Sequence, residues 1–200
     1  TLLDSQSQVM QNALVYGATS GAQAMLNGHI GGSAAFIDVV GVSSVTTGGT
    51  ASIGGNLGII TGGGNDQVNL GGQMRSLYLD TGVGNDQVSV SALVDTSAEI
   101  LLGPGDDTAT LTGTIGDPGT QKGFLYLDGG PGNDSVTAAS SFEINGIGII
   151  TLGTGNNTFI LQPRGDQLAA IVIGGFGGTN TFVGNRNQLK YPPTGFQVFM

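Results

Sequence analysis

A short turn motif that recurs at nearly regular intervals constrains this chain more than any other feature of its sequence. Each copy holds two glycines followed by Asn or Asp. Five copies cover residues 62–66, 82–86, 103–107, 130–134 and 153–157, and a sixth copy, one residue longer, ends at position 180. The steps between successive copies are similar, and the longest lies between Asp107 and Asp134. Self-similarity at a nearly fixed period predicts a solenoid in which every repeat forms one coil.

Apolar residues flank each turn in a pattern that is typical of strands. Pairs such as Leu77 and Leu79 precede a turn, and pairs such as Val68 and Leu70 follow one. This period-two alternation, rich in β-branched residues, predicts half-buried strands whose apolar side chains point inward. One turn motif per coil places all the turns in a single column on one edge. The preference of parallel crossovers makes the coil right-handed.

We therefore predict an all-β, single-domain, right-handed parallel β-helix (β-solenoid) of about 6 to 8 coils, each of 20–27 residues. Coils about 4.8 Å apart would form a rod of roughly 35 to 40 Å. Within the domain 1–200, residues 1–32 are the N-terminal cap and a degenerate start, 33–183 the coils, and 184–200 a C-terminal cap or linker. Glycine, 38 of 200 residues, lacks the every-third-residue spacing of collagen.

The first coil needs a cover, because a β-helix exposes unpaired strand edges at its ends. We expect a short N-terminal helix over residues 8–16, capped by Asp4 or Ser5 and ended by Gly17. Its apolar face would hold Val9, Met10, Ala13 and Leu14. The longest coil contains a stretch of turn-forming residues, 116–123, which predicts a loop projecting from one corner.

Charge and rare residues limit the functions that are open to the chain. The net charge is −9, and 12 of the 14 acidic residues are Asp. An acidic surface argues against nucleic acid as a partner. The sequence has no cysteine and one histidine, His29, which excludes a thiol nucleophile and a zinc cluster. No apolar run reaches the length of a membrane span, so we expect a soluble chain.

The turns resemble the calcium-binding G-G-x-G-x-D repeat of RTX proteins, and in particular the one-turn-per-coil repeat regions of bacterial RTX adhesins. The resemblance covers residues 59–183, and Gly153-Thr154-Gly155-Asn156 matches the adhesin repeat. It implies a hemolysin-type, calcium-binding module that is secreted or displayed on a bacterial-type cell surface. The chain does not begin with a signal peptide, so we expect a mature product or an excised domain.

The chemistry of the turns agrees with a calcium ligand. Calcium takes six to eight oxygen ligands from carboxylates and backbone carbonyls, and glycines let the backbone aim its carbonyls into a turn. Two stacked turns could enclose one ion. The candidate ligands are the acidic and amide residues Asp66, Asp86, Asp107, Asp134, Asn65, Asn85, Asp106 and Asn133, with the glycines Gly62, Gly64, Gly82, Gly84, Gly103, Gly105, Gly130 and Gly132. Asn157 and Asn180 lack the carboxylate and predict weak binding or none.

Two alternatives stay open. The first is a metal-free column in which the Asn and Asp side chains bond to one another. The second is a carbohydrate-active β-helix, either polysaccharide lyase-like or sugar-binding, whose basic residue would be Arg75, Lys122 or Arg164 and whose carboxylate pair would be Asp80 and Asp128. It requires an outward patch of aromatic and charged residues on consecutive coils.

The function expected from the sequence is a calcium-rigidified, non-catalytic structural or adhesin-like module. Its expected partners are calcium ions and a cell-surface component, matrix component or polysaccharide. Ions that bind only the folded coils would stabilise them by mass action.

Overall fold

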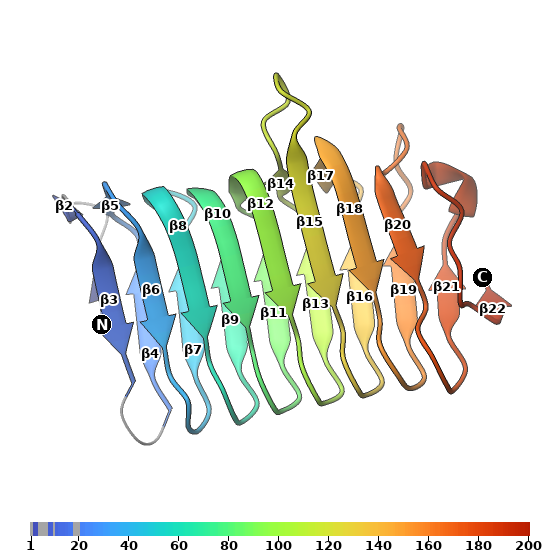
Figure 1. Ribbon diagram of the computed structural model, residues 1–200, viewed down its shortest axis with the longest axis horizontal. Helices are drawn as coiled ribbons and strands as arrows, with labels where there is room; N and C mark the ends of the chain where they lie inside the picture. Colours follow the sequence, from blue (N-terminus) through green and yellow to red (C-terminus); the bar gives the residue numbers. More distant parts are fainter. Residues whose placement is uncertain (1, 4–7, 10, 18–20) are drawn as a thin grey trace.

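The computed structural model describes residues 2–3, 8–9, 11–17 and 21–200, and these form a parallel β-solenoid. In Figure 1 the long strands run down the near side, the chain turns at the lower edge, and short strands run up the far side. Successive coils advance from left to right, so the coil is right-handed, as predicted. The turn motifs lie in one row along the lower edge.

The far side is a ten-stranded parallel sheet of short strands, and those of the central coils each follow a turn motif. Each coil contributes one strand of two to four residues to this sheet. In order, its strands are β1 (Leu2–Leu3), β4 (Gln23–Leu26), β7 (Ser44–Thr47), β9 (Gln67–Leu70), β11 (Gln87–Val90), β13 (Thr108–Leu111), β16 (Ser135–Ala138), β19 (Thr158–Leu161), β21 (Thr181–Val183) and β22 (Val198–Phe199).

The near side is a twelve-stranded sheet that bends at a corner. The bend shows as a register shift between Met74 and Ser76, and in four coils it splits the strand in two. The undivided strands are β8 (Ser52–Ile60), β10 (Gln73–Asp80), β12 (Leu93–Leu101) and β20 (Ala170–Ile173). The divided ones are β2 (Gln8–Val9) with β3 (Ala13–Tyr16), β5 (His29–Ile30) with β6 (Ala34–Ile37), β14 (Thr114–Ile115) with β15 (Gly123–Asp128), and β17 (Glu143–Ile144) with β18 (Gly146–Thr151).

The interior is filled by columns of identical positions on successive coils. On the short strands one column runs through buried Val45, Val68, Val88, Ala109, Val136, Phe159 and Phe182. On the long strands another runs through buried Ile59, Leu79, Ile100, Leu127, Ile150 and Val172. The predicted period-two alternation is therefore confirmed, with every second side chain directed into one continuous core.

The predicted N-terminal helix is wrong. Residues 8–9 and 13–16 are strands, and β3 pairs in parallel with β6. Ala13 and Val15 pack against the core, whereas Leu14 and Tyr16 are each 67% exposed. Alternate residues thus face inward, the period of a strand and not of a helix. The proposed capping residues Asp4 and Ser5, and Met10 of the proposed apolar face, lie outside the described residues.

The corner loop agrees with the prediction from the sequence, and the C-terminal segment covers one end of the core. The loop between Ile115 and Gly123 projects from the corner of the coil, as predicted (Figure 1). After β21 the chain forms one 3₁₀ turn, η1 (Arg186–Gln188), and returns as β22 beside β21. There Phe196 packs edge-on against Phe182 with 5.6 Å between ring centroids, covering the end of the core. In the described part of the chain, no helix has the length and apolarity to cross a membrane.

Close stacking of the turns depends on glycine. Gly105 has φ of +154°, and a Cβ atom on it would lie 1.7 Å from the carbonyl oxygen of Gly84 on the preceding coil. We expect Gly105→Ala to separate two coils and to lower the free energy of unfolding by more than about 1 kcal/mol. Gly63→Ala is the matched control, because nothing lies within 4 Å of the added Cβ. Equal melting temperatures of the two variants would contradict the stacking argument.

Candidate metal centre in the turn column

The last residue of each turn motif is buried and bonds to the coil before it. One carboxylate oxygen of Asp86 accepts the backbone N–H of Asp66 at 2.7 Å, and Asp107 accepts that of Asp86 at 2.7 Å. The same bond links Asp134 to Asp107 at 3.0 Å and Asn157 to Asp134 at 2.8 Å. We call this series the inner ladder; it comprises Asp66, Asp86, Asp107, Asp134, Asn157 and Asn180. Ser43 and Gln197 continue it at its two ends.

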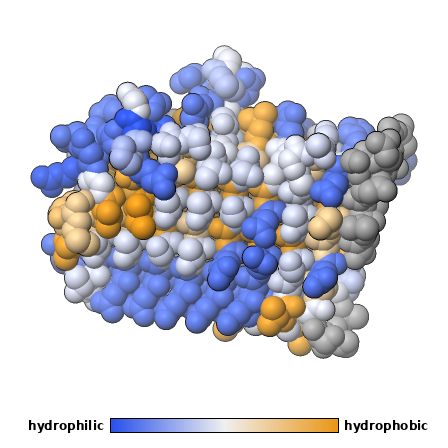
Figure 2. All heavy atoms as spheres, turned by 180° about the vertical axis from the view of Figure 1, so that it is seen from behind, coloured by the Kyte–Doolittle hydropathy of each residue, from blue (hydrophilic) through white to orange (hydrophobic). Residues whose placement is uncertain are grey.

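The preceding residue of each motif forms a second ladder that points the other way. The side chain of Asn65 accepts the backbone N–H of Asn85 at 2.8 Å, and Asn85 accepts that of Asp106 at 2.9 Å. This outer ladder continues through Asn133, Asn156 and Thr179 and is exposed. It lies on the hydrophilic band along the lower edge of Figure 2. Together the ladders bond each turn to the coils on both sides.

The second carboxylate oxygen of each inner-ladder Asp has no partner. Oδ2 of Asp66, Asp86, Asp107 and Asp134 is buried and makes no hydrogen bond, although the residues are at most 2% exposed. At the same position on the later coils, an asparagine supplies a hydrogen-bond donor. Asn157 donates from Nδ2 to the carbonyl oxygen of Gly174 at 3.4 Å. An Asp in this position presents an acceptor where an Asn presents a donor.

At Asp134 two hydrogen-bond acceptors face the same space beside Gly129. A Cβ atom on Gly129 would lie 2.7 Å from Asp134 Oδ2 and 2.9 Å from the carbonyl oxygen of Leu152. Leu152 occupies the position that Gly174 holds one coil later, where Asn157 donates its N–H. Two oxygens therefore border one small space with no hydrogen between them. This surrounding favours the neutral, protonated form of Asp134, because a buried charge without a partner is strongly disfavoured.

On the two earlier coils a threonine hydroxyl satisfies the carbonyl oxygen that faces the carboxylate. The hydroxyl of Thr61 donates to the carbonyl of Thr81 at 3.0 Å, and that of Thr81 donates to the carbonyl of Leu102 at 2.6 Å. Both hydroxyls also lie beside a carboxyl group and lower its pKa, Thr61 that of Asp66 and Thr81 that of Asp86. On the next two coils this position holds Leu102 and Gly129, so Asp107 and Asp134 have no hydroxyl beside them.

Burial is the main influence on the pKa values of the inner ladder. It raises the pKa of Asp66 and Asp86, against the opposing effect of hydrogen bonds to Ser43, Thr61, Asp66 and Thr81. Burial raises the pKa of Asp107 to about 7, and the neighbouring charges of Asp134, Asp86 and Asp106 add to the shift. It raises the pKa of Asp134 to about 6, with contributions from Asp106 and Asp128. Asp107 and Asp134 thus favour the neutral form most clearly.

Two backbone carbonyls of the turns near these residues also lack a hydrogen bond that the matching carbonyls of other turns receive. In other coils the residue between the two glycines donates its N–H to the preceding coil, as Val83 does to the Gly62 carbonyl at 2.7 Å. Pro104 and Pro131 stand in that position here and have no N–H, so the carbonyls of Gly82 and Gly103 receive no such bond. Among the described residues, no three His, Cys, Asp or Glu side chains form a metal-binding group. An ion would therefore combine one or two carboxylates with backbone carbonyls, a donor set that calcium accepts.

The sequence singled out Asp66, Asp86, Asp107 and Asp134 as candidate calcium ligands, and in the structure they form the inner ladder, but it did not separate the roles of their neighbours. Asn65, Asn85, Asp106 and Asn133 use their side-chain oxygens in the outer ladder, and the turn glycines allow close stacking. Sequence reasoning missed Thr61 and Thr81, which precede a turn by one residue. It also missed Asp38, whose Oδ2 accepts from the Ser43 hydroxyl at 2.8 Å. On this coil the acid stands where Thr61 stands on the next coil, and the hydroxyl residue Ser43 stands where Asp66 does. The threonines could have been found from the sequence, because each directly precedes the first glycine of a turn motif.

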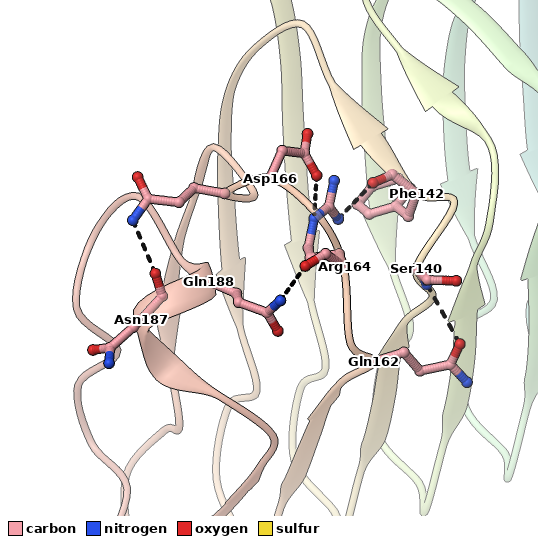
Figure 3. Close-up of polar contacts among 8 residues, drawn as sticks. Ser140, Phe142, Gln162, Arg164, Asp166, Asn187 and Gln188 are labelled. Atoms are coloured by element: carbon pink, nitrogen blue, oxygen red, sulfur yellow. Dashed lines mark hydrogen bonds and ion pairs between the residues drawn. The ribbon is translucent and has the colours of Figure 1, made fainter.

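The residues considered for catalysis have structural contacts. Arg164 is held by Asp166 at 3.0 Å and by the carbonyl oxygen of Phe142 at 2.7 Å, and its own carbonyl accepts from Gln188 (Figure 3). Asp80 and Asp128 each accept the N–H of a turn glycine two residues on, Gly82 at 3.1 Å and Gly130 at 3.3 Å. These contacts orient turns and the C-terminal segment.

The other two basic residues and the histidine lie apart from the turn column. Arg75 is exposed at the corner, Lys122 is in the corner loop, and His29 is exposed on β5. The described residues show no acid–base pair or nucleophile assembled from these groups.

Comparison of the chain with models of protein families, with curated proteins and with solved structures gave no match.

The raised pKa values predict that acid stabilises the cation-free protein. For a carboxyl whose folded-state pKa lies above the unfolded value of 3.8, the stabilisation is present below that value and is lost as the pH rises through the folded-state pKa. In EGTA we therefore expect the melting temperature to fall as the pH rises from about 4, and to level off once the pH exceeds the folded-state pKa values of Asp134 and Asp107, about 6 and about 7. A melting temperature that rises over this interval would contradict the prediction.

The complete hydrogen bonding of Asn157 and Asn180 in the inner ladder suggests a stabilising substitution. In Asp107→Asn/Asp134→Asn, each new side chain would keep its acceptor oxygen and donate to a carbonyl as Asn157 does. We expect a higher melting temperature in EGTA at pH 8, by several degrees, and a weaker dependence on pH, since two buried carboxylates are removed. Asp95→Asn/Asp117→Asn, at the corner and in its loop, is the control. A double ladder variant less stable than the wild type at pH 8 would refute this account.

Proposed function

We propose that this chain is a calcium-binding structural module, a non-catalytic and adhesin-like rod that acts at the cell surface or after secretion. The observation that carries the proposal is the stack of four buried carboxylate oxygens without a hydrogen-bond partner. A calcium ion would remove the repulsion between each Oδ2 and the oxygens around it. The resemblance of the turns to RTX repeats supports the same ligand.

The best place for an ion is the part of the column around Asp107 and Asp134. These two carboxyl groups lack a threonine hydroxyl, and the proline turns leave the carbonyls of Gly82 and Gly103 without the N–H that other coils supply. Asp66 and Asp86 have hydroxyls beside them and would bind more weakly. Asn157 and Asn180 complete their hydrogen bonds with Nδ2 and need no ion.

The mechanism is linkage between ion binding and stacking. At neutral pH a carboxyl group of the inner ladder must be either protonated or paired with a cation, and calcium would supply the cation when it is abundant. An ion that binds only the folded coils stabilises them by about 2.7 kcal/mol at a free concentration 100 times its dissociation constant. The chain would then be a stiff spacer where calcium is plentiful and a looser one where it is scarce.

The test is a calcium titration of the protein in EGTA at pH 8, followed by thermal melting and by calorimetry. We expect binding heat and a rise in melting temperature that grows with calcium concentration, with a smaller effect of magnesium, whose octahedral geometry is stricter. Asp107→Asn/Asp134→Asn should stay folded and lose most of this response, and Asp95→Asn/Asp117→Asn should keep it. A wild-type protein with no binding heat and an unchanged melting temperature in millimolar calcium would overturn the proposal and leave a proton-satisfied ladder.

A further inference from the structure

The outer face of the twelve-stranded sheet carries a patch that the linear sequence conceals. Strand pairing places Tyr78 beside Glu99 and Glu99 beside Tyr126, on three consecutive coils. In the next row, Phe124 lies beside Ser97, and on the other side Asp80 and Asp128 flank Leu101. We call Tyr78, Asp80, Glu99, Phe124, Tyr126 and Asp128 the outer patch. It meets the requirement of aromatic and charged residues on consecutive coils.

Two aromatic rings of the outer patch are exposed to solvent, and the third, Tyr126, is half-buried. Tyr78 is 37% exposed and Phe124 40% exposed, whereas Phe36, Phe142, Phe159 and Phe182 are buried in the core. Ile147, 37% exposed, extends the apolar surface to the following coil beside Phe124. Rings that stand on a flat sheet at neighbouring positions form a platform, and a tyrosine joins an apolar face to a polar hydroxyl.

Acceptors lie between the rings. Glu99 is exposed and close enough to both tyrosines to raise their pKa, after the larger effect of burial and alongside the nearer acids Asp80 and Asp128. The Tyr126 hydroxyl donates to Asp128 Oδ2 at 3.4 Å. No basic residue is among the strand residues that form this patch. The face therefore offers apolar rings, tyrosine hydroxyls and carboxylate oxygens, with a net negative charge.

We propose that the outer patch binds a neutral polysaccharide strand. Sugar rings have an apolar C–H face that packs on an aromatic ring and hydroxyl groups that donate to carboxylates. Tyr78 and Tyr126 are two strand spacings apart, about 9.6 Å, so an oligosaccharide rather than a single sugar ring is needed to contact both. Three carboxylates repel uronic acid polymers, which separates this ligand from the substrates of polysaccharide lyases. The patch adjoins the turn column, because Asp80 and Asp128 also accept N–H groups of turn glycines, but its tyrosines and Glu99 lie on the face of the sheet.

Two other occupants predict different behaviour. A basic peptide would be held by charge, so its affinity would collapse at high salt. A second copy of this chain would bury the same rings in a symmetric contact and would require carboxylates to face carboxylates. The alternation of acids with rings favours a ligand that is rich in hydroxyl groups and carries no charge.

The experiment uses the whole chain and a panel of soluble neutral polysaccharides, namely α-glucan, β-glucan, mannan and galactan, with polygalacturonate as the anionic counterpart. Retardation in affinity electrophoresis is measured first, and tyrosine fluorescence is then titrated, since the chain has no tryptophan. We expect at least one neutral polymer to bind and polygalacturonate not to bind. Tyr78→Ala and Tyr126→Ala should each weaken binding about tenfold, because each removes one stacking ring.

Matched variants separate the outcomes. Tyr191→Ala, in the C-terminal segment, should bind like the wild type, and circular dichroism in calcium and in EGTA checks that each variant is folded. Glu99→Gln should weaken neutral glycan binding less than either tyrosine substitution does, since an amide still bonds to hydroxyls. The proposal is overturned by failure to bind the whole neutral panel, by tyrosine variants that bind like the wild type, by salt-sensitive binding of a lysine-rich peptide alone, or by self-association that the tyrosine variants abolish.

Discussion

The fold depends on how the turns satisfy their backbone N–H groups. A coil reverses its direction within a few residues at the turn edge, so it cannot continue a strand ladder there. The inner and outer ladders supply the missing acceptors from side chains of the coil after and the coil before. Since the two ladders point in opposite directions, each turn is tied on both sides. The repeated pair of Asn or Asp residues therefore has a structural role that does not require an ion.

An acid in the inner ladder carries a cost that an amide does not. Asn157 and Asn180 satisfy both ends of their side chains, whereas Asp66, Asp86, Asp107 and Asp134 leave one buried oxygen without a donor. Four consecutive acids in this place couple the stability of the rod to pH and, under the proposed function, would couple it to calcium, with the adjacent threonine, leucine or glycine setting how strongly. The turn edge would then regulate stiffness while the flat faces stay free for contacts.

The fold was largely predictable from the sequence. The period of the turns indicated the solenoid, the alternation of residues such as Val68 and Leu70 indicated the inward faces, and the longest coil indicated the corner loop. The N-terminal segment was misread because Val9, Met10, Ala13 and Leu14 also fit a helical stripe, and short apolar segments do not distinguish the two periods well. Pairing of β3 with β6 decided in favour of a strand.

The sequence by itself determined the architecture, the column of acids and the residues that face inward, because each follows from spacing along the chain. Only the tertiary structure decided which oxygen of each carboxylate is used, that a hydroxyl stands beside Asp66 and Asp86 but not beside Asp107 and Asp134, and that Glu99 lies between two tyrosines. The physical reason is that coils of unequal length absorb their differences at the corner and in the loops. Neighbours across coils are therefore fixed by hydrogen-bond register and not by any constant separation in the sequence.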